Sequence, residues 1–232
     1  MAQSWHDLLF MHWPVPVEQL RPLIPDALEI DTFKGQAWIA VVPFWMSGIR
    51  FRFTFPVPGT HTFPELNVRT YVKPKKKENP ERPGVWFFSL DAASRLAVRV
   101  ARAWFNLPYY DAAMQSVLAS KQVRYESTRF HRNAPKTEFK GAYEPTGEVF
   151  YSKPGTLEHW LTERYCLYSA SPSGTLYRGE IHHHPWPLQP AQAQIDKNSM
   201  LEPLKVQSAV SAPHLLFSKR IDVVCWAPLR LD

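Results

Sequence analysis

The sequence is poor in the residues that most cofactor and nucleophile signatures require. Its 232 residues contain only two cysteines and nine glycines. Glycine this sparse does not favour a phosphate-binding loop, and no G-x-S-x-G elbow or Cys-x-x-Cys pair occurs. No stretch approaches the ~20 apolar residues that a membrane span requires. We therefore expect no cofactor, no metal and no membrane among its partners.

The two cysteines also argue against a disulfide framework. Cys166 and Cys225 lie in the apolar contexts Tyr-Cys-Leu-Tyr and Val-Cys-Trp, and neither has a base near it in sequence. No signal peptide precedes them. We expect two buried, reduced thiols in a soluble cytoplasmic protein, and no nucleophilic triad.

Acidic residues are fewer than basic ones. Lys and Arg number 27 against 21 Asp and Glu, which gives a formal net charge of +6. The balance favours anionic partners. The basic run at Lys73, Lys75, Lys76 and Lys77 reads as the solvated tip of a long hairpin, because stacking aromatics do not accompany it. We therefore expect no nucleic-acid partner.

The most informative stretch is residues 64–72, which alternate as a strand that Pro64 begins. Period-two geometry places Glu65, Asn67, Arg69 and Tyr71 on one face. This polar face has two interpretations. It is either the wet face of an antiparallel strand or a row of groups that point into a barrel and converge on a ligand.

After a returning strand at 85–91, residues 92–105 change to helical spacing. Leu96, Val100 and Trp104 form the apolar face, and Asp91 or Ser94 is the candidate N-cap. The arginines gather on the opposite side. Arg95, nearest the strand end, is a candidate anion ligand. Pro108 requires the helix to end by residue 107.

The remaining segments predict a mainly β (α+β) fold in one domain, 1–232. About eight to ten strands and three short helices indicate an antiparallel β-barrel or curled sheet with helices at its ends. We expect a hairpin at 28–46, with its turn at residues 33–36. The Phe- and Pro-rich segment 51–63 is typical of a loop over a pocket or of a subunit contact, so a homo-oligomer is a further expectation.

Two other groups are candidates for the site. His182 and His184 share one strand face, but no third ligand pattern accompanies them, so we interpret them as pocket residues and not as a metal site. In Glu163-Arg164, alternation sends only one of the two side chains toward a pocket, and we keep Arg164 as the candidate.

Several blocks of the chain, in one order and at ordinary spacings, resemble a known family, the YqjF-like bacterial proteins, which is a domain of unknown function (domain of unknown function 2071). The blocks are LLFMHWPVP, LRPLIPDALEIDTFKGQAWIAVVPF, FPELNVRTYV, GVWFFSLDAASRLAVRVAR, LPYY, GTLEHWLTERYCLY and HHPWPLQ. That family is distantly similar to acetoacetate decarboxylase. The resemblance implies an acetoacetate-decarboxylase-like barrel with an interior pocket.

The resemblance also implies which residues occupy the pocket. The decarboxylase uses a lysine that forms a Schiff base, activated by a hydrophobic site or an adjacent cation. Its two lysines follow a Phe-Pro pair, and the counterpart here is Leu107-Pro108-Tyr109-Tyr110. Neither tyrosine can form an imine. Glu65 matches the glutamate of the decarboxylase strand, so the resemblance implies a pocket that keeps the acid and lacks the covalent catalyst.

Two hypotheses follow. In the first, the chain binds a small anionic or oxygenated ligand or performs acid/base chemistry on it, with Glu65 and Tyr109 as the catalytic candidates. The ligand-binding candidates are Asn67, Arg69, Arg95, Tyr110, Arg164, His182 and His184. We expect only one tyrosine to reach the pocket, Tyr109, with Tyr110 in the wall. In the second, the protein is non-catalytic, structural or oligomerising, with a vestigial pocket.

Overall fold

Strands dominate the structure and pair into one continuous sheet. The computed structural model describes residues 1–50, 62–76, 81–208, 210 and 212–231. Within them, thirteen strands follow the order β13-β10-β9-β5-β6-β7-β8-β11-β12-β1-β3-β4-β2. Their bounds are β1 Ala2–Val15, β2 Leu28–Ile30, β3 Ala37–Arg50, β4 Thr62–Pro74, β5 Gly84–Ala92, β6 Tyr109–Ala119, β7 Gln122–Arg129, β8 Glu138–Pro145, β9 Cys166–Ala170, β10 Leu176–His183, β11 Leu188–Asn198, β12 His214–Cys225 and β13 Leu229–Arg230.

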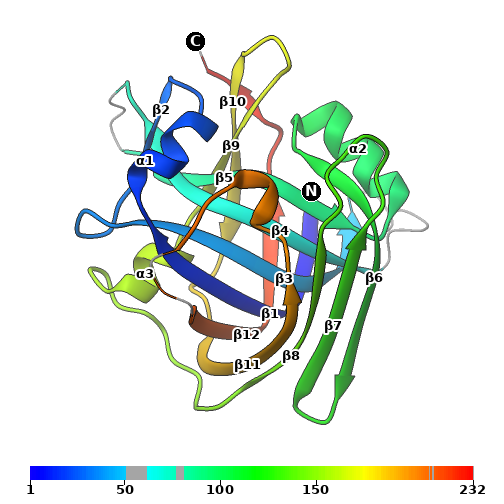
Figure 1. Ribbon diagram of the computed structural model, residues 1–232. Coiled ribbons are helices and arrows are strands. Elements are labelled where there is room, and N and C mark those ends of the chain that lie inside the picture. The colour runs from blue at the N-terminus through cyan, green and yellow to red at the C-terminus, as the bar shows by residue number, and fades with distance from the viewer. Residues whose placement is uncertain (51–61, 77–80, 209, 211, 232) are drawn as a thin grey trace.

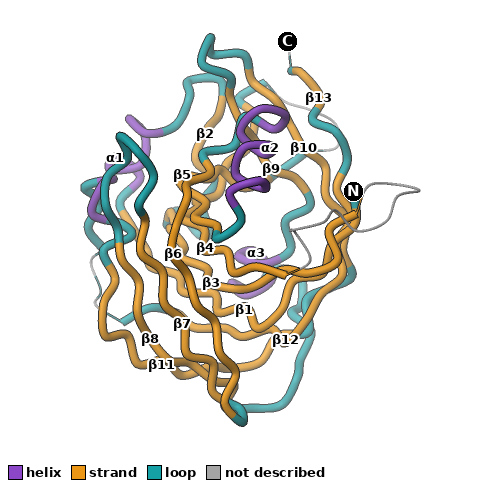
Figure 2. The backbone as a smooth tube through the Cα atoms, turned by 90° about the vertical axis from the view of Figure 1, so that its right-hand side faces the viewer, coloured by secondary structure: helices purple, strands orange, loops and turns teal. Residues whose placement is uncertain are grey.

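The helices are short and lie around the sheet. They are α1 (Val17–Leu20), α2 (Arg95–Phe105) and α3 (Leu157–Thr162), with single 3-10 turns at Arg21–Leu23 and Glu202–Leu204. Ser94 caps α2, because its hydroxyl accepts a hydrogen bond from the Ala97 amide. Figure 2 shows α2 beside β5 and β9, at one end of the molecule.

The sheet closes on itself twice. The additional pairings β4–β5 and β10–β12 complete two rings of paired strands. One ring runs β5-β6-β7-β8-β11-β12-β1-β3-β4, and the other runs β5-β9-β10-β12-β1-β3-β4. Both rings share β12, β1, β3, β4 and β5. In Figure 1 the shared strands β3 and β4 cross the middle of the molecule, with β6, β7 and β8 on one side.

The shared wall is buried on both faces, which explains its unusual residue pattern. On one face, Leu66 and Val68 of β4 pack with Tyr125 and Tyr143 in the larger hydrophobic core. On the other face, Glu65 and its period-two neighbours point into the second ring. A strand with an apolar face and a polar face can therefore lie at the centre of the fold, because its polar face lines an interior space and not the outside.

The mainly β fold with a curled sheet and short helices that was predicted from the sequence is confirmed. The strands β4 and β5 pair as the predicted long hairpin, and α2 lies where the periodicity places it. The predicted hairpin at 28–46 is wrong. The turn at 33–36 forms, but β2 pairs with β4, because β1 and β4 already occupy both edges of β3.

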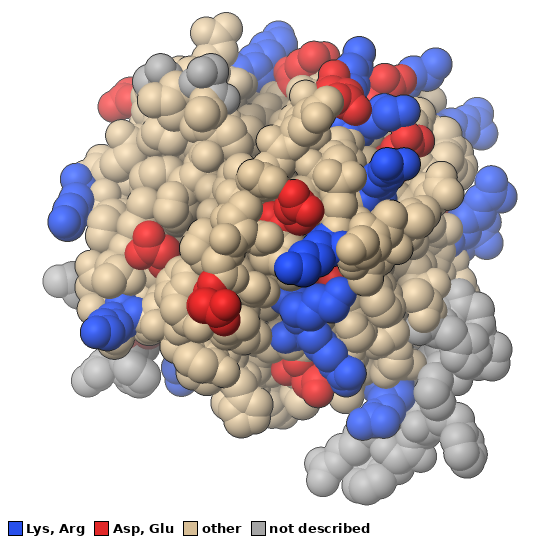
Figure 3. All heavy atoms as spheres, turned by 90° about the horizontal axis from the view of Figure 1, so that it is seen from below, with Lys and Arg blue, Asp and Glu red and all other residues tan. Residues whose placement is uncertain are grey.

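Two features of the fold concern expectations about partners. Among the described residues, no helix is long and apolar enough to cross a membrane. Most of the Phe- and Pro-rich segment, 51–61, and Lys77 of the basic run lie outside the described residues. On the face seen in Figure 3, basic and acidic side chains are interspersed. The expectations about nucleic acid and oligomers stay predictions.

Candidate functional site

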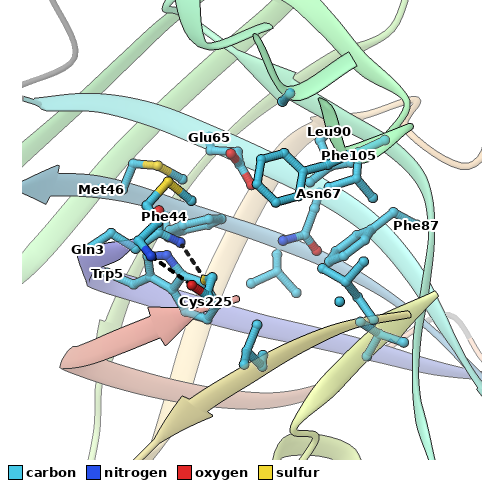
Figure 4. A pocket seen from close by; sticks show the side chains of 18 of the residues that line it. Gln3, Trp5, Phe44, Met46, Glu65, Asn67, Phe87, Leu90, Phe105 and Cys225 are labelled. Carbon is cyan, nitrogen blue, oxygen red and sulfur yellow. Dashed lines mark hydrogen bonds between the residues drawn. The ribbon is translucent and has the colours of Figure 1, made fainter. Parts of the chain in front are cut away.

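A cavity of about 280 Å³ occupies the second, smaller ring. Its floor is the shared wall, and α2 covers it from one side. Strand β4 contributes a continuous row from its inner face, namely Phe63, Glu65, Asn67 and Arg69. The polar face of β4 therefore points into an interior cavity and is not the solvent-exposed face of the strand. Figure 4 shows Glu65 and Asn67 pointing into the same space as Phe44, Phe87 and Phe105.

Glu65 is the buried acid of this cavity. Its side chain is 3% exposed, and Tyr109 Oη donates a hydrogen bond to Oε2 over 2.8 Å. Burial raises the pKa of Glu65 from 4.5 to about 8, the Tyr109 hydrogen bond opposes the rise, and the charge of Asp91 adds to it. At neutral pH the Glu65 carboxyl is therefore mostly protonated, and it becomes a carboxylate only in mildly alkaline solution.

The strand pairings hold this acid in place. Tyr109 begins β6, which runs parallel to β5 with Leu90 opposite Tyr109. The Glu65 carbonyl accepts a hydrogen bond from Tyr125 Oη over 2.7 Å. Burial and the neighbouring Glu65 raise the pKa of Tyr109 well above 10, so its hydroxyl stays protonated. The pair thus presents a neutral acid and a phenol to the cavity.

Two guanidinium groups line the cavity at the other end of the row. Arg164 Nη1 contacts Asp31 Oδ2 at 2.6 Å, and the Arg164 guanidinium carbon lies over the Trp160 ring, 4.4 Å from its centroid. Arg69, only 9% exposed, lies over the ring of Phe10. Among the described residues Arg69 has no carboxylate partner. The two ends of the polar row therefore differ, with an acid at one and an uncompensated positive charge at the other.

Five buried side-chain polar atoms of cavity residues lack a hydrogen-bond partner in the described part of the chain. They are Trp5 Nε1, Asn67 Oδ1, Arg69 Nε, Arg164 Nη2 and Trp186 Nε1. A buried polar group without a partner costs free energy, roughly 1–3 kcal/mol, and a charged one costs more. All of them belong to residues that line the cavity, and those of Asn67 and Arg69 lie in the row of β4. They indicate a place for a ligand with oxygen atoms and a negative charge.

In the histidine run, the side chain that faces the cavity is the middle one, and not the two flanking ones that were predicted. His183 is buried and lines the cavity, while His182 and His184 are exposed. The predicted ligand-binding residues His182 and His184 therefore do not line this cavity. Alternation along β10 turns Gly179, Ile181 and His183 inward, so its flanking residues point outward.

His183 is held as a neutral ring. Its Nδ1 lies 2.7 Å from the carbonyl oxygen of His184 and donates to it. Burial lowers the pKa of His183 below its usual 6.5. No group of three or more His, Cys, Asp or Glu side chains with a metal-binding arrangement occurs in the part of the chain that the structure describes.

Two other candidates lie away from the cavity. Arg95 is exposed on α2 and lies over the ring of Phe130, because the arginine face of that helix points to solvent. The ring of Tyr110 contacts the guanidinium of Arg129 at 4.3 Å and the edge of His131. Of the tyrosine pair, only Tyr109 lines the cavity. Neither Arg95 nor Tyr110, both predicted to bind the ligand, lines this cavity.

Sequence periodicity predicted helix α2 but did not predict that it forms part of the cavity wall. Val98 is its buried residue, and Leu96, Ala97, Val100, Ala101 and Phe105 line the cavity. The predicted apolar face is therefore correct for Leu96 and Val100, whereas Trp104 is exposed. The signal was present in the sequence, since two alanines flank Leu96 and Val100, and small residues leave room beside a helix.

The cysteines are both free thiols. Cys166 is buried, and Cys225 lines the cavity. Burial raises the pKa of each to about 11, so neither is a thiolate at neutral pH. No lysine occurs among the described residues that line the cavity, and Lys121 and Lys153 are exposed.

Comparison with known proteins shows to which family this chain belongs. The family model described as an uncharacterized conserved protein, domain of unknown function 2071, matches residues 2–222. The chain belongs to this family. The uncharacterized protein YqjF of Bacillus subtilis is 45% identical over 230 residues, which cover 99% of this chain and 91% of that protein.

Solved structures similar to this member of the family include enzymes. The enduracididine biosynthesis enzyme MppR in complex with pyruvate superposes with a TM-score of 0.65 at 9% identity, covering 100% of this chain and 90% of that one. Acetoacetate decarboxylase from Legionella pneumophila gives 0.60 at 9% identity, covering 100% and 87%. An acetoacetate decarboxylase-like enzyme from Sphingomonas wittichii gives 0.58 at 14%, covering 100% and 93%. These likenesses establish the fold.

Proposed function

We propose that the cavity binds a small carboxylic acid that also carries a carbonyl group, and that Glu65 transfers a proton to or from it. The observation that carries this proposal is one strand face that presents both a buried acid and a guanidinium whose Nε has no hydrogen-bond partner. The acid is Glu65, with a pKa of about 8, and the guanidinium is that of Arg69. An enzyme of the same fold was solved with pyruvate, which supports an oxo acid as the ligand.

The chemistry follows from the charge state of each group. Arg69 neutralises the ligand carboxylate, with Arg164 and Asn67 available for its oxygens. The ionised form of Glu65 removes the proton next to the ligand carbonyl and becomes the neutral acid, while the Tyr109 hydroxyl donates a hydrogen bond to the carbonyl oxygen and stabilises the enolate. The protonated Glu65 then returns a proton to carbon. A pKa near the working pH lets one carboxyl serve as acid and, once ionised, as base.

This mechanism uses no imine. By the sequence resemblance, Tyr109 and Tyr110 correspond to the lysines of the decarboxylase, and the described residues of the cavity wall include no lysine. Borohydride treatment with a ketone substrate is therefore expected to leave no stable adduct. Isolation of a lysine adduct, for instance at Lys121 or Lys153, would contradict the proposal.

Solvent exchange tests the proton transfer directly. Incubation with 2-oxobutanoate in D₂O, followed by proton NMR, should show loss of the C3 proton signal. Glu65→Gln should slow this exchange by roughly 10²- to 10⁴-fold, the usual contribution of one acid/base group. Tyr109→Phe should slow it by about twofold to tenfold, the value of one hydrogen bond.

Matched variants separate catalysis from folding. Tyr110→Phe keeps the ring contacts with Arg129 and His131 outside the cavity and should exchange like the wild type. Arg69→Gln should abolish the preference for the acid over its methyl ester. Exchange that is undiminished in Glu65→Gln would reject Glu65 as the acid. If 2-oxobutanoate binds to none of the proteins, the alternative of a non-catalytic protein with a vestigial pocket gains support.

A further inference from the structure

The wall of the cavity is far more apolar than a small oxo acid requires. Beyond the polar row of β4, the wall is built of residues from seven other strands and from α2, and most of their side chains are aromatic or aliphatic. At the end opposite Arg69, Phe63 lies next to Met46 across the β3–β4 ladder, and Met46 lies next to Trp5 across the β1–β3 ladder. These three side chains form a mainly apolar end, with Gln3 and the N-terminal residue Met1 lining the cavity beside Trp5.

The order of residues along β4 fixes the arrangement of the two ends. Phe63, Glu65, Asn67 and Arg69 follow one another on one face, and each step of two residues advances about 6.6 Å. The guanidinium end and the apolar end are therefore separated by about 20 Å of strand, with Glu65 and Asn67 between them. Figure 4 shows Met46, Phe44 and Trp5 on one side of Glu65 and Asn67, and Phe87 on the other.

The opening of the cavity is apolar as well. Leu96 of α2 and Trp226, which follows β12, both line the cavity, yet 48% and 53% of their surfaces are exposed. Residues with both properties lie where the cavity meets solvent. Large apolar side chains at a mouth are costly to leave in water and favour entry of an apolar group.

The cavity volume is also larger than a short acid fills. About 280 Å³ corresponds to roughly nine water molecules at ~30 Å³ each. Bonded heavy atoms lie closer together than waters do, so the space suits a molecule of about ten or more non-hydrogen atoms. A three- or four-carbon oxo acid would leave the apolar end empty or filled with poorly bonded water.

From these observations we infer that the ligand is an amphipathic monocarboxylic acid, with a hydrocarbon tail of about six to eight carbon atoms. Its carboxylate lies at Arg69 and Asn67, and its tail lies under α2 toward Met46, Phe63 and Trp5. This inference rests on the proposed function and adds the substrate class. It assigns α2, and Ala97 in particular, the role of setting the tail length.

Calorimetric titration of the full chain with unbranched fatty acids tests the inference. From butanoate through hexanoate to octanoate, the Kd should fall about fourfold per added methylene, the effect of burying one CH₂. The gain per methylene should decline by dodecanoate, whose tail exceeds the cavity. Octylamine, with the same tail and the opposite charge, should bind at least tenfold more weakly than octanoate.

A pair of helix variants locates the tail. Ala97 lines the cavity, whereas Ala103 lies on the exposed side of the same helix, and leucine is a good helix former at both positions. Ala97→Leu should weaken octanoate at least tenfold and change butanoate by less than twofold. Ala103→Leu should match the wild type for both acids.

The outcomes separate this inference from the proposed function. Butanoate and octanoate binding equally well would overturn the tail and leave the acid-binding site standing. If the Kd depends on chain length in the same way in Ala97→Leu and in Ala103→Leu, the tail does not lie under α2. Failure of every acid to bind, with or without a tail, would reject the proposed function itself.

Discussion

At the scale of single residues, the protonation of Glu65 links pH to stability. Its pKa is about 8 in the fold against 4.5 ordinarily, so the folded protein binds more protons than the unfolded chain between these values. The free energy of unfolding should therefore fall as pH rises from about 5 to 8, by up to ~1.4 kcal/mol per pH unit from this group alone.

Comparison with Glu65→Gln isolates that contribution, since the other titrating groups are common to both proteins. Urea denaturation at pH 5, 6, 7 and 8 should show the wild type close to Glu65→Gln at pH 5 and progressively less stable than the variant toward pH 8. A stability difference that does not change with pH would show that Glu65 titrates normally. It would also remove the basis for its role as a neutral acid.

Residue periodicity predicted part of this site, and the reasons for its failures are physical. Alternation sorted Glu65, Asn67 and Arg69 onto one face, and the fold then buried that face. The same rule sorted His182 and His184 together but does not say which face is inward. That choice depends on how β10 pairs with β9 on one side and with β12 on the other. Strands β9 and β12 are distant from each other in sequence.

At the scale of elements, α2 is both a helix and one side of the cavity. Its N-terminus depends on Ser94, whose hydroxyl accepts from the Ala97 amide. Ser94→Ala should lower the free energy of unfolding by about 1 kcal/mol. It should also speed amide hydrogen exchange in the first turn of α2, and Ser94→Asp, which keeps an acceptor, should restore both. Slow exchange in the alanine variant would show that packing alone holds the helix.

Some strands could not be predicted from local sequence. Strand β6 contains Ala, Met, Gln and Ser, which do not favour strands, and β11 includes Pro190. Both form because a neighbour is available. Strand β6 pairs with β7 over eight residue pairs, and β11 pairs with β8. By contrast, β4 and β7 alternate strongly and were predictable, because a buried face repeats every second residue.

At the scale of the whole molecule, the larger ring depends on two short ladders. Strands β5 and β6 pair over three residue pairs, and so do β11 and β12. Next to the first of these junctions, Arg129 of β7 reaches Asp91 of β5, with Nη2 at 2.7 Å and Nε at 2.8 Å from the same carboxylate oxygen. Both side chains are almost fully buried. This ion pair holds β7 against the wall that the two rings share.

Removal of one partner should therefore destabilise the whole chain. Arg129→Met leaves Asp91 buried without its cation and should cost about 3–5 kcal/mol in urea denaturation at pH 8. Burial already raises the pKa of Asp91, and Arg129 opposes that rise. Without Arg129 the pKa rises further, so protonation relieves the loss, and the variant should be less impaired at pH 5 than at pH 8.

The double variant Asp91→Val with Arg129→Met decides between a junction that needs charge and one that needs only packing. Two apolar side chains leave no buried charge, so the double variant should recover most of the stability that Arg129→Met loses, and its remaining deficit should not depend on pH in this range. A double variant no more stable than Arg129→Met would show that the ion pair itself fixes the β5–β6 junction. In that case the acid at Glu65, which Tyr109 of β6 holds, should lose its raised pKa together with the junction.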